Sequence, residues 1–142
     1  MSLYSLVVSV HVLVALLAVG PLVAIPLGAH SARRLRLGLG ALGAWAQQLF
    51  RLAGAGMVVA FLSGALLDYI ARGAYHYAGW FRLAGLLLAV TAVCQARARA
   101  ALKQGLAGKL PDAVALRRIE LWGSTAISAV AAIAVLMEWK PF

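Results

Sequence analysis

Hydrophobic residues form four long stretches along the chain, and polar residues collect in the gaps between them. The stretches cover residues 3–27, 49–70, 79–96 and 121–139. Each is close to the roughly 20 residues that an α-helix, rising about 1.5 Å per residue, needs to cross a hydrocarbon core about 30 Å thick. None alternates between polar and apolar positions as a barrel strand does. The pattern predicts an all-α integral membrane four-helix bundle that forms a single transmembrane domain over residues 1–142.

Composition supports a membrane protein and narrows its partners. Hydrophobic residues make up 64% of the chain and charged residues 12%, which is too apolar for an ordinary soluble domain. The net charge is +9, but the basic residues lie beside the spans and few aromatic residues are interleaved with them. This arrangement suits the anionic surface of a lipid bilayer and argues against nucleic acid as a partner.

The basic residues predict how the bundle is oriented. Nine of the 13 Lys and Arg residues fall in the first and third gaps, whereas Arg72, Arg82 and Lys140 lie around the opposite ends of the spans. By the positive-inside rule, the first and third gaps face the cytoplasm, so both termini lie on the outer, periplasmic side of a bacterial inner membrane. The nine residues are Arg33, Arg34, Arg36, Arg97, Arg99, Lys103, Lys109, Arg117 and Arg118.

Small residues recur every four positions in three spans and are expected to face the bundle interior, because helices in lipid associate through close contact over small side chains. Pro21 and Pro26 are expected to kink the first helix. Residues 30–42 are predicted to form a short segment on the membrane surface, and residues 97–118 a basic extension of the third helix followed by a turn. The three small-residue stripes are Gly20/Ala24/Gly28, Gly56/Ala60/Gly64 and Ser124/Ser128/Ala132.

Ionisable side chains inside apolar spans are costly and are therefore functional candidates. Most of them converge on the outer half of the predicted bundle. An alternative interpretation treats Asp68, Arg72 and Arg82 as interfacial charges that pair among the headgroups. The candidates are His11, Asp68, His76, Arg82 and Glu138.

On the inner side, Arg51 and Glu120 begin the second and fourth spans at matching depth. They are expected to form one ion pair shielded from lipid. A small transporter or channel would use the same two residues to line its path.

His11 is the sharpest candidate, because it interrupts the apolar run 6–19 about 12 Å below the outer end of its helix. It is either a core histidine bonded to a neighbouring carbonyl or to a serine such as Ser63, or an axial ligand of haem iron. His76 could supply a second axial ligand if the outer loop folds inward, with Arg82 beside the cofactor. His30 could not, since it lies about 28 Å away along the same helix.

The chain also resembles a known family at three short places. These are His11 with Pro26 fifteen residues on and His30 near the helix end, the Gly-Trp-Phe-Arg-Leu sequence at 79–83, and the terminal Lys-Pro-Phe at 140–142. In these residues and in its helix order, the chain resembles the HemJ-type protoporphyrinogen oxidases and a neighbouring family of uncharacterised predicted integral membrane proteins. The resemblance implies a four-helix membrane protein that uses haem b, with His11 in the position of the family's first-helix histidine.

The chain departs from the family's pattern at three positions. The family typically has a tryptophan between its first-helix histidine and the next glycine, an arginine after the proline, and a His-x-Lys in the third helix. The matching stretches here are 12–19, Leu27 and Arg82-Leu83-Ala84. A haem-binding or accessory relative is therefore expected.

The sequence leads to one functional hypothesis and keeps two alternatives open. The hypothesis is an inner-membrane protein that binds haem b, or a porphyrin or quinone, through His11 and serves electron transfer or tetrapyrrole oxidation. The alternatives are a non-enzymatic small subunit of a larger membrane complex and a small homo-oligomeric transporter or channel. No His-x-Glu, Cys-x-x-Cys, Gly-x-Ser-x-Gly or phosphate-loop motif is present, which leaves open whether the chain is an enzyme.

Overall fold

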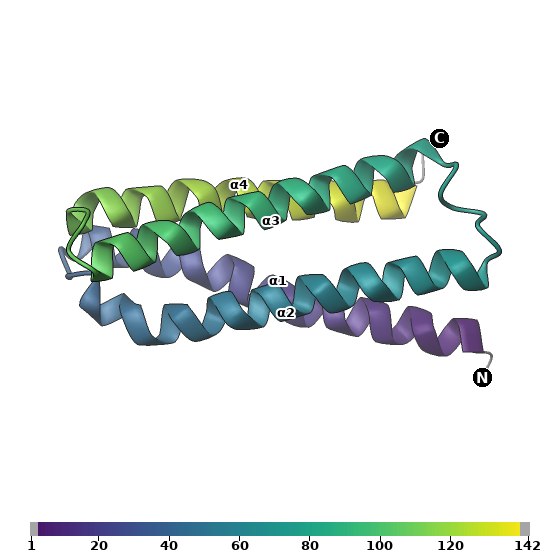
Figure 1. Cartoon of the computed structure of the whole chain (residues 1–142), viewed down its shortest axis with the longest axis horizontal. Coiled ribbons are helices and arrows are strands. Elements are labelled where there is room, and N and C mark those ends of the chain that lie inside the picture. Colours follow the sequence, from purple (N-terminus) through teal and green to yellow (C-terminus); the bar gives the residue numbers. More distant parts are fainter. Residues whose placement is uncertain (1–2, 140–142) are drawn as a thin grey trace.

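The computed structural model describes residues 3–139 and consists of four long antiparallel helices (Figure 1). All four are long and apolar enough to cross a membrane, which confirms the predicted all-α four-helix fold. The connections 35–39 and 107–111 lie at one end of the bundle, here called the basic end. The start of α1, the end of α4 and the connection 71–78 lie at the other, the terminal end (Figure 1). The helices are α1 (Leu3–Arg34), α2 (Gly40–Ile70), α3 (Gly79–Leu106) and α4 (Asp112–Trp139).

The helices are longer than the predicted spans, and nearly all of the added length lies at the basic end. The α3 helix continues to Leu106 and is followed by a turn, as predicted. The predicted surface segment 30–42 is wrong: α1 continues to Arg34 and α2 begins at Gly40. The reason is burial, because Ala32 and Leu42 are packed inside the bundle, where a surface segment would leave them exposed.

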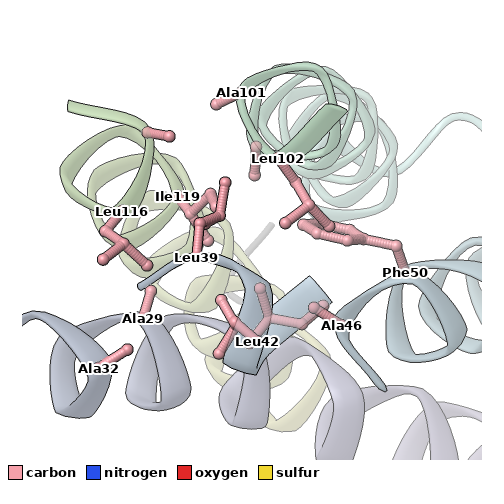
Figure 2. Packing of buried hydrophobic residues seen from close by; sticks show 13 residues of the cluster. Ala29, Ala32, Leu39, Leu42, Ala46, Phe50, Ala101, Leu102, Leu116 and Ile119 are labelled. Carbon is pink, nitrogen blue, oxygen red and sulfur yellow. The ribbon is translucent and has the colours of Figure 1, made fainter. Parts of the chain in front are cut away.

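The main hydrophobic core lies at the basic end and receives residues from all four helices (Figure 2). Leu102 of α3 lies beside Phe50 of α2, and Leu39, from the connection between α1 and α2, lies beside Ile119 of α4 (Figure 2). Many of the other members are alanines, so the helices approach closely. A Cβ added at Gly105 would meet Leu39 and Ala115, so that this crossing requires a glycine.

Towards the terminal end the bundle is held less tightly. A second, smaller cluster lies next to the main core and consists of Leu22, Ala53, Cys94 and Ala126. The α1/α2 and α3/α4 hairpins diverge beyond it (Figure 1). The α1 helix packs against α2 and α4, and α3 against α4; α2 and α3 contact each other least, and α2 and α4 lie diagonally opposite.

Small residues form the closest helix crossings, but only part of the predicted stripes faces the interior. A Cβ on Gly56 would lie 2.6 Å from the Cβ of Ala18, and one on Gly28 would lie 2.5 Å from the Trp45 ring, so both glycines face a neighbouring helix. Gly20, by contrast, has open space around it. The α1 helix continues through both of its prolines, and Pro26 packs against Gly123 of α4.

The predicted stripe on α4 is wrong, because Ser124, Ser128 and Ala132 are exposed. Residues four apart advance by about 400° around a helix, so a strict four-residue repeat drifts off the buried face. The buried face of α4 follows alternating steps of three and four residues instead. Its members are Leu116, Ile119, Gly123, Ala126 and Ala129.

Gly54 and Gly56, two residues apart on α2, provide a matched test of this packing. Gly56→Ala should lower the free energy of unfolding by about 1–3 kcal/mol, because the new methyl group overlaps Ala18. Gly54→Ala should leave stability unchanged or raise it, since nothing lies within 4 Å of the added Cβ and alanine favours the helix. Thermal unfolding of both variants in detergent measures the difference, and equal midpoints would contradict the α1–α2 crossing.

Candidate functional site

His11 lies on the face of α1 that points into the bundle. Ala18, Ile25 and Ala32 follow it at seven-residue intervals, and all three are buried. Because seven residues are close to two helical turns, His11 lies on the same face and extends it towards the terminal end. The side chain is half-buried. It therefore lies between helices, as either interpretation of this histidine requires.

The His11 ring is oriented by Ser63 of α2. Its Nδ1 lies 2.7 Å from the Ser63 Oγ, which is itself 2.7 Å from the carbonyl oxygen of Val59 and 3.1 Å from that of Ala60. A hydroxyl has one hydrogen, so when Ser63 donates to a carbonyl it must accept from the Nδ1–H of His11. This assigns the proton to Nδ1 and a lone pair to Nε2.

A second polar group, at the terminal end, is built around Asp68 near the end of α2. Its Oδ1 accepts hydrogen bonds from the backbone N–H of Tyr75 at 2.8 Å and of His76 at 3.1 Å. Its Oδ2 lies 3.3 Å from the Nδ1 of His76. Arg82 of α3 donates from Nε to the carbonyl oxygen of His76 at 2.9 Å. The structure thus brings together three predicted site residues, Asp68, His76 and Arg82.

The connection 71–78 explains why Asp68 does not pair with Arg72. After α2 the chain turns through positive φ angles of 56° at Arg72 and 75° at Gly73, which end the helix and fold the connection back over Asp68. Both carboxylate oxygens are then used by the connection itself. Asp68, Arg72 and His76 line an open groove of about 670 Å³ at this end of the molecule.

Two tyrosines add a contact that the sequence did not indicate. The hydroxyls of Tyr4, in the first turn of α1, and Tyr75 lie 2.8 Å apart. This hydrogen bond, more than partial burial, raises the pKa of Tyr75 above its ordinary value. The Tyr75 ring also packs near Trp80, with ring centroids 5.8 Å apart. Aromatic residues at span ends usually anchor a protein at the membrane surface, so their pattern carried no separate signal for this contact.

His11 and His76 are not brought together. His11 is bonded to Ser63, and His76 to Asp68, which lies five residues further along α2. That spacing corresponds to about 7.5 Å of helix rise. The inward fold of the connection that would make His76 a second ligand is therefore not the arrangement observed.

At the basic end, Glu120 bonds to α1 rather than to Arg51. Its Oε1 lies 2.8 Å from the Nδ1 of His30, and its Oε2 lies 3.0 Å from the Nη2 of Arg33. The expected Arg51–Glu120 pair does not form because α2 and α4 are diagonally opposite, and Arg51 is exposed. Asp112 makes a further link at this end by accepting the backbone N–H of Leu39 at 2.8 Å.

Gln95 of α3 is a buried polar residue that was not predicted from the sequence, because its side chain is not ionisable. It is 6% exposed, and its amide nitrogen and oxygen have no hydrogen-bond partner among the described residues. Thr91, one turn earlier, is fully buried but donates to the carbonyl oxygen of Leu87 at 2.9 Å. A glutamine within an apolar span was the signal that could have identified this position.

Comparisons with known proteins do not assign this chain to a family. No protein-family model, no curated protein and no solved structure matches the chain. Within residues 3–139, no group of three or more His, Cys, Asp or Glu side chains is placed to hold a metal ion. The terminal Lys-Pro-Phe at 140–142, part of the family resemblance, lies outside the described residues. The resemblance therefore stays a prediction.

Glu120 and Glu138, both on α4, test the role of the α1–α4 ion pair. Glu120→Gln should lower the free energy of unfolding by about 1 kcal/mol, because it removes the charge that His30 and Arg33 share across the two helices. The same change at the exposed Glu138 should have no measurable effect. Thermal unfolding in detergent at pH 7 compares the two variants, and equal stabilities would show that the ion pair contributes nothing.

Proposed function

We propose that the chain is a multi-pass protein of the bacterial inner membrane. All four helices are long and apolar enough to span the bilayer. Large apolar side chains are exposed along the predicted spans, among them Leu17 at 67% and Phe61 at 59%. Exposing this apolar surface to water would be energetically unfavourable, whereas in a bilayer lipid chains cover it.

The proposed orientation places the basic end in the cytoplasm. Nine of the 13 Lys and Arg residues belong to this end, and the positive-inside rule retains such segments on the cytoplasmic side. The terminal end, with Asp68, His76 and Arg82, would then face the periplasm.

Reporter fusions test this orientation. A reporter that fluoresces only in the cytoplasm should be dark when fused after Phe142 and bright when fused after a truncation at Gly108, in the connection between α3 and α4. A periplasm-active phosphatase should give the opposite pair of results. Fluorescence from the Phe142 fusion would overturn the orientation.

We further propose that the protein binds one haem b through Nε2 of His11. The observation that carries this proposal is the hydrogen bond between His11 and Ser63. Histidines that ligate metals almost always donate their other ring N–H to a fixed acceptor, which sets the tautomer and aims the free nitrogen. A core histidine needs a hydrogen-bond partner for each ring nitrogen, and this bond supplies the partner of Nδ1. The haem proposal therefore depends on the other nitrogen, Nε2.

The position of His11 in the bundle supports a haem with a single histidine ligand. The histidine lies near the start of α1, in the half of the bundle where the hairpins diverge (Figure 1). Arg82, exposed at the start of α3, offers a positive charge for a haem propionate. His76 is held by Asp68, so this chain's described residues supply one axial histidine and no second at the same depth.

A bound haem would supply reversible one-electron redox chemistry, as electron transfer or tetrapyrrole oxidation requires. The residues of this chain would have three tasks. His11 provides the ligand nitrogen, Ser63 keeps its ring oriented, and the apolar side chains of α1 and α2 exclude water. The same lone pair could accept a hydrogen bond from a quinol hydroxyl, and an absorption spectrum separates these two ligands.

His11→Ala tests the haem proposal. The purified wild-type protein, expressed with haem supplementation, should show a Soret band. In the variant this band should be lost or blue-shifted while helix content and expression are nearly unchanged, because His11 lies outside both buried clusters. A wild-type protein without a Soret band, or a variant with an unaltered spectrum, would remove the basis of the proposal. A membrane protein that then co-purifies with the chain would favour the small-subunit alternative.

Ser63→Ala tests the orienting bond separately from the ligand. Loss of the hydroxyl should weaken haem retention by about tenfold, since partners of a ligand histidine typically contribute that much. Ser124→Ala, on the exposed face of α4, is the matched control and should retain haem as the wild type does. His76→Ala should leave the spin state of the iron unchanged, and a shift from low-spin to high-spin would instead identify His76 as a second ligand.

A further inference from the structure

An open groove of about 550 Å³ lies at the basic end, between the end of α1 and the start of α4. Arg33 of α1 lines one side, and Arg117 and Arg118 of α4 line the other. The α4 residues of the groove are spaced by one, three or four positions, so they share one face of the helix. Three apolar residues complete the lining: Ala113, Val114 and Leu121.

The groove carries an excess of positive charge. Arg33 is neutralised by Glu120, at 3.0 Å, and the same carboxylate accepts from His30. Arg117 and Arg118 are exposed and form no ion pair within residues 3–139.

No other acidic side chain compensates these two charges. The chain has four acidic residues. Asp112, at the start of α4, accepts the backbone N–H of Leu39 and forms no ion pair within residues 3–139, while Asp68 and Glu138 belong to the terminal end. Two guanidinium groups thus remain available for an anion.

The apolar part of the lining shows what kind of anion fits. Leu121 begins the predicted fourth span, and Arg117 and Arg118 lie three or four residues before it, about 5 Å along the helix. In the proposed orientation this is the depth of the cytoplasmic headgroups. Leu121 is 60% exposed, so the same face of the helix presents two cations and, on their bilayer side, an apolar side chain. A soluble anion makes no apolar contact, whereas the acyl chain of a lipid packs against an apolar side chain.

We propose that this groove is a binding site for the headgroup of an anionic phospholipid. The guanidinium groups of Arg117 and Arg118 contact the phosphodiester, and Arg33 of α1, held by its ion pair with Glu120, forms the opposite wall. Leu121, on the bilayer side of the two arginines, contacts the apolar part of the lipid. The inference rests on the proposed membrane orientation and is independent of haem binding.

Native mass spectrometry of the full chain in a non-ionic detergent tests the site, with phosphatidylglycerol and phosphatidylcholine as probes. Phosphatidylglycerol should bind at least about tenfold more tightly than phosphatidylcholine. Arg117→Gln/Arg118→Gln should weaken its binding by about 25-fold, since each basic residue near an anionic membrane surface contributes on the order of fivefold. Equal binding of the two lipids to the wild type would overturn the proposal.

Arg97→Gln/Arg99→Gln is the matched control, because it removes the same charge from exposed residues of α3 that do not line the groove. It should reduce binding by less than about threefold, and a loss as large as that of the groove variant would show diffuse attraction without a site. Inorganic phosphate should not displace the lipid, whereas displacement at equal concentration would make the groove a simple anion site. Unchanged circular dichroism in both variants establishes that folding is intact. Reporter fusions separately test the orientation.

Discussion

Close contact between helices over small residues is the interaction on which this structure depends. Lipid chains are as apolar as leucine, so leucine-rich surfaces alone give membrane helices little reason to associate. Here Gly56 packs against Ala18, Gly123 against Pro26, and Gly105 against Leu39 and Ala115. These crossings lie in the middle of the bundle and at its basic end, and the core surrounds them. Of the neighbouring helices, α2 and α3 contact each other least, and the two hairpins diverge towards the terminal end (Figure 1).

This uneven packing separates two kinds of polar site. At the basic end, Glu120, Asp112 and their partners bridge elements that are already tightly packed, so they reinforce the core. At the terminal end, Asp68 accepts hydrogen bonds from the connection between α2 and α3, and His11 bonds to Ser63 across the α1–α2 interface. A ligand-binding group can occupy this half without competing with the contacts that hold the fold.

The sequence predicted the number and order of helices because long apolar runs leave few alternatives in a bilayer. The prediction from the sequence failed for features that hydropathy alone does not determine. The helices continue past the hydrocarbon length because Ala32 and Leu42 are buried at the basic end, although three arginines lie between them in the sequence. The partners of Glu120 were not predicted because depth along a helix shows which residues lie at the same level in the membrane. It does not show which helices are neighbours. Only the packing of α4 on α1, with α2 across the diagonal, selects His30 and Arg33 over Arg51.

The direction of His11 illustrates the same limit and its physical cause. In a soluble bundle, the buried face of a helix is apolar and the exposed face polar, so the pattern of hydropathy reveals which way a residue points. In a membrane span both faces are apolar, and the faces differ in size instead. On α1 the interior positions carry alanine at 18 and 32, while leucines at 13, 16 and 17 are exposed. His11 falls in register with the small residues, seven positions before Ala18. Side-chain volume is therefore only part of the signal for the buried face, since Ile25 in the same heptad register is large and fully buried, and the hydrogen bond to Ser63 is what places this histidine between α1 and α2.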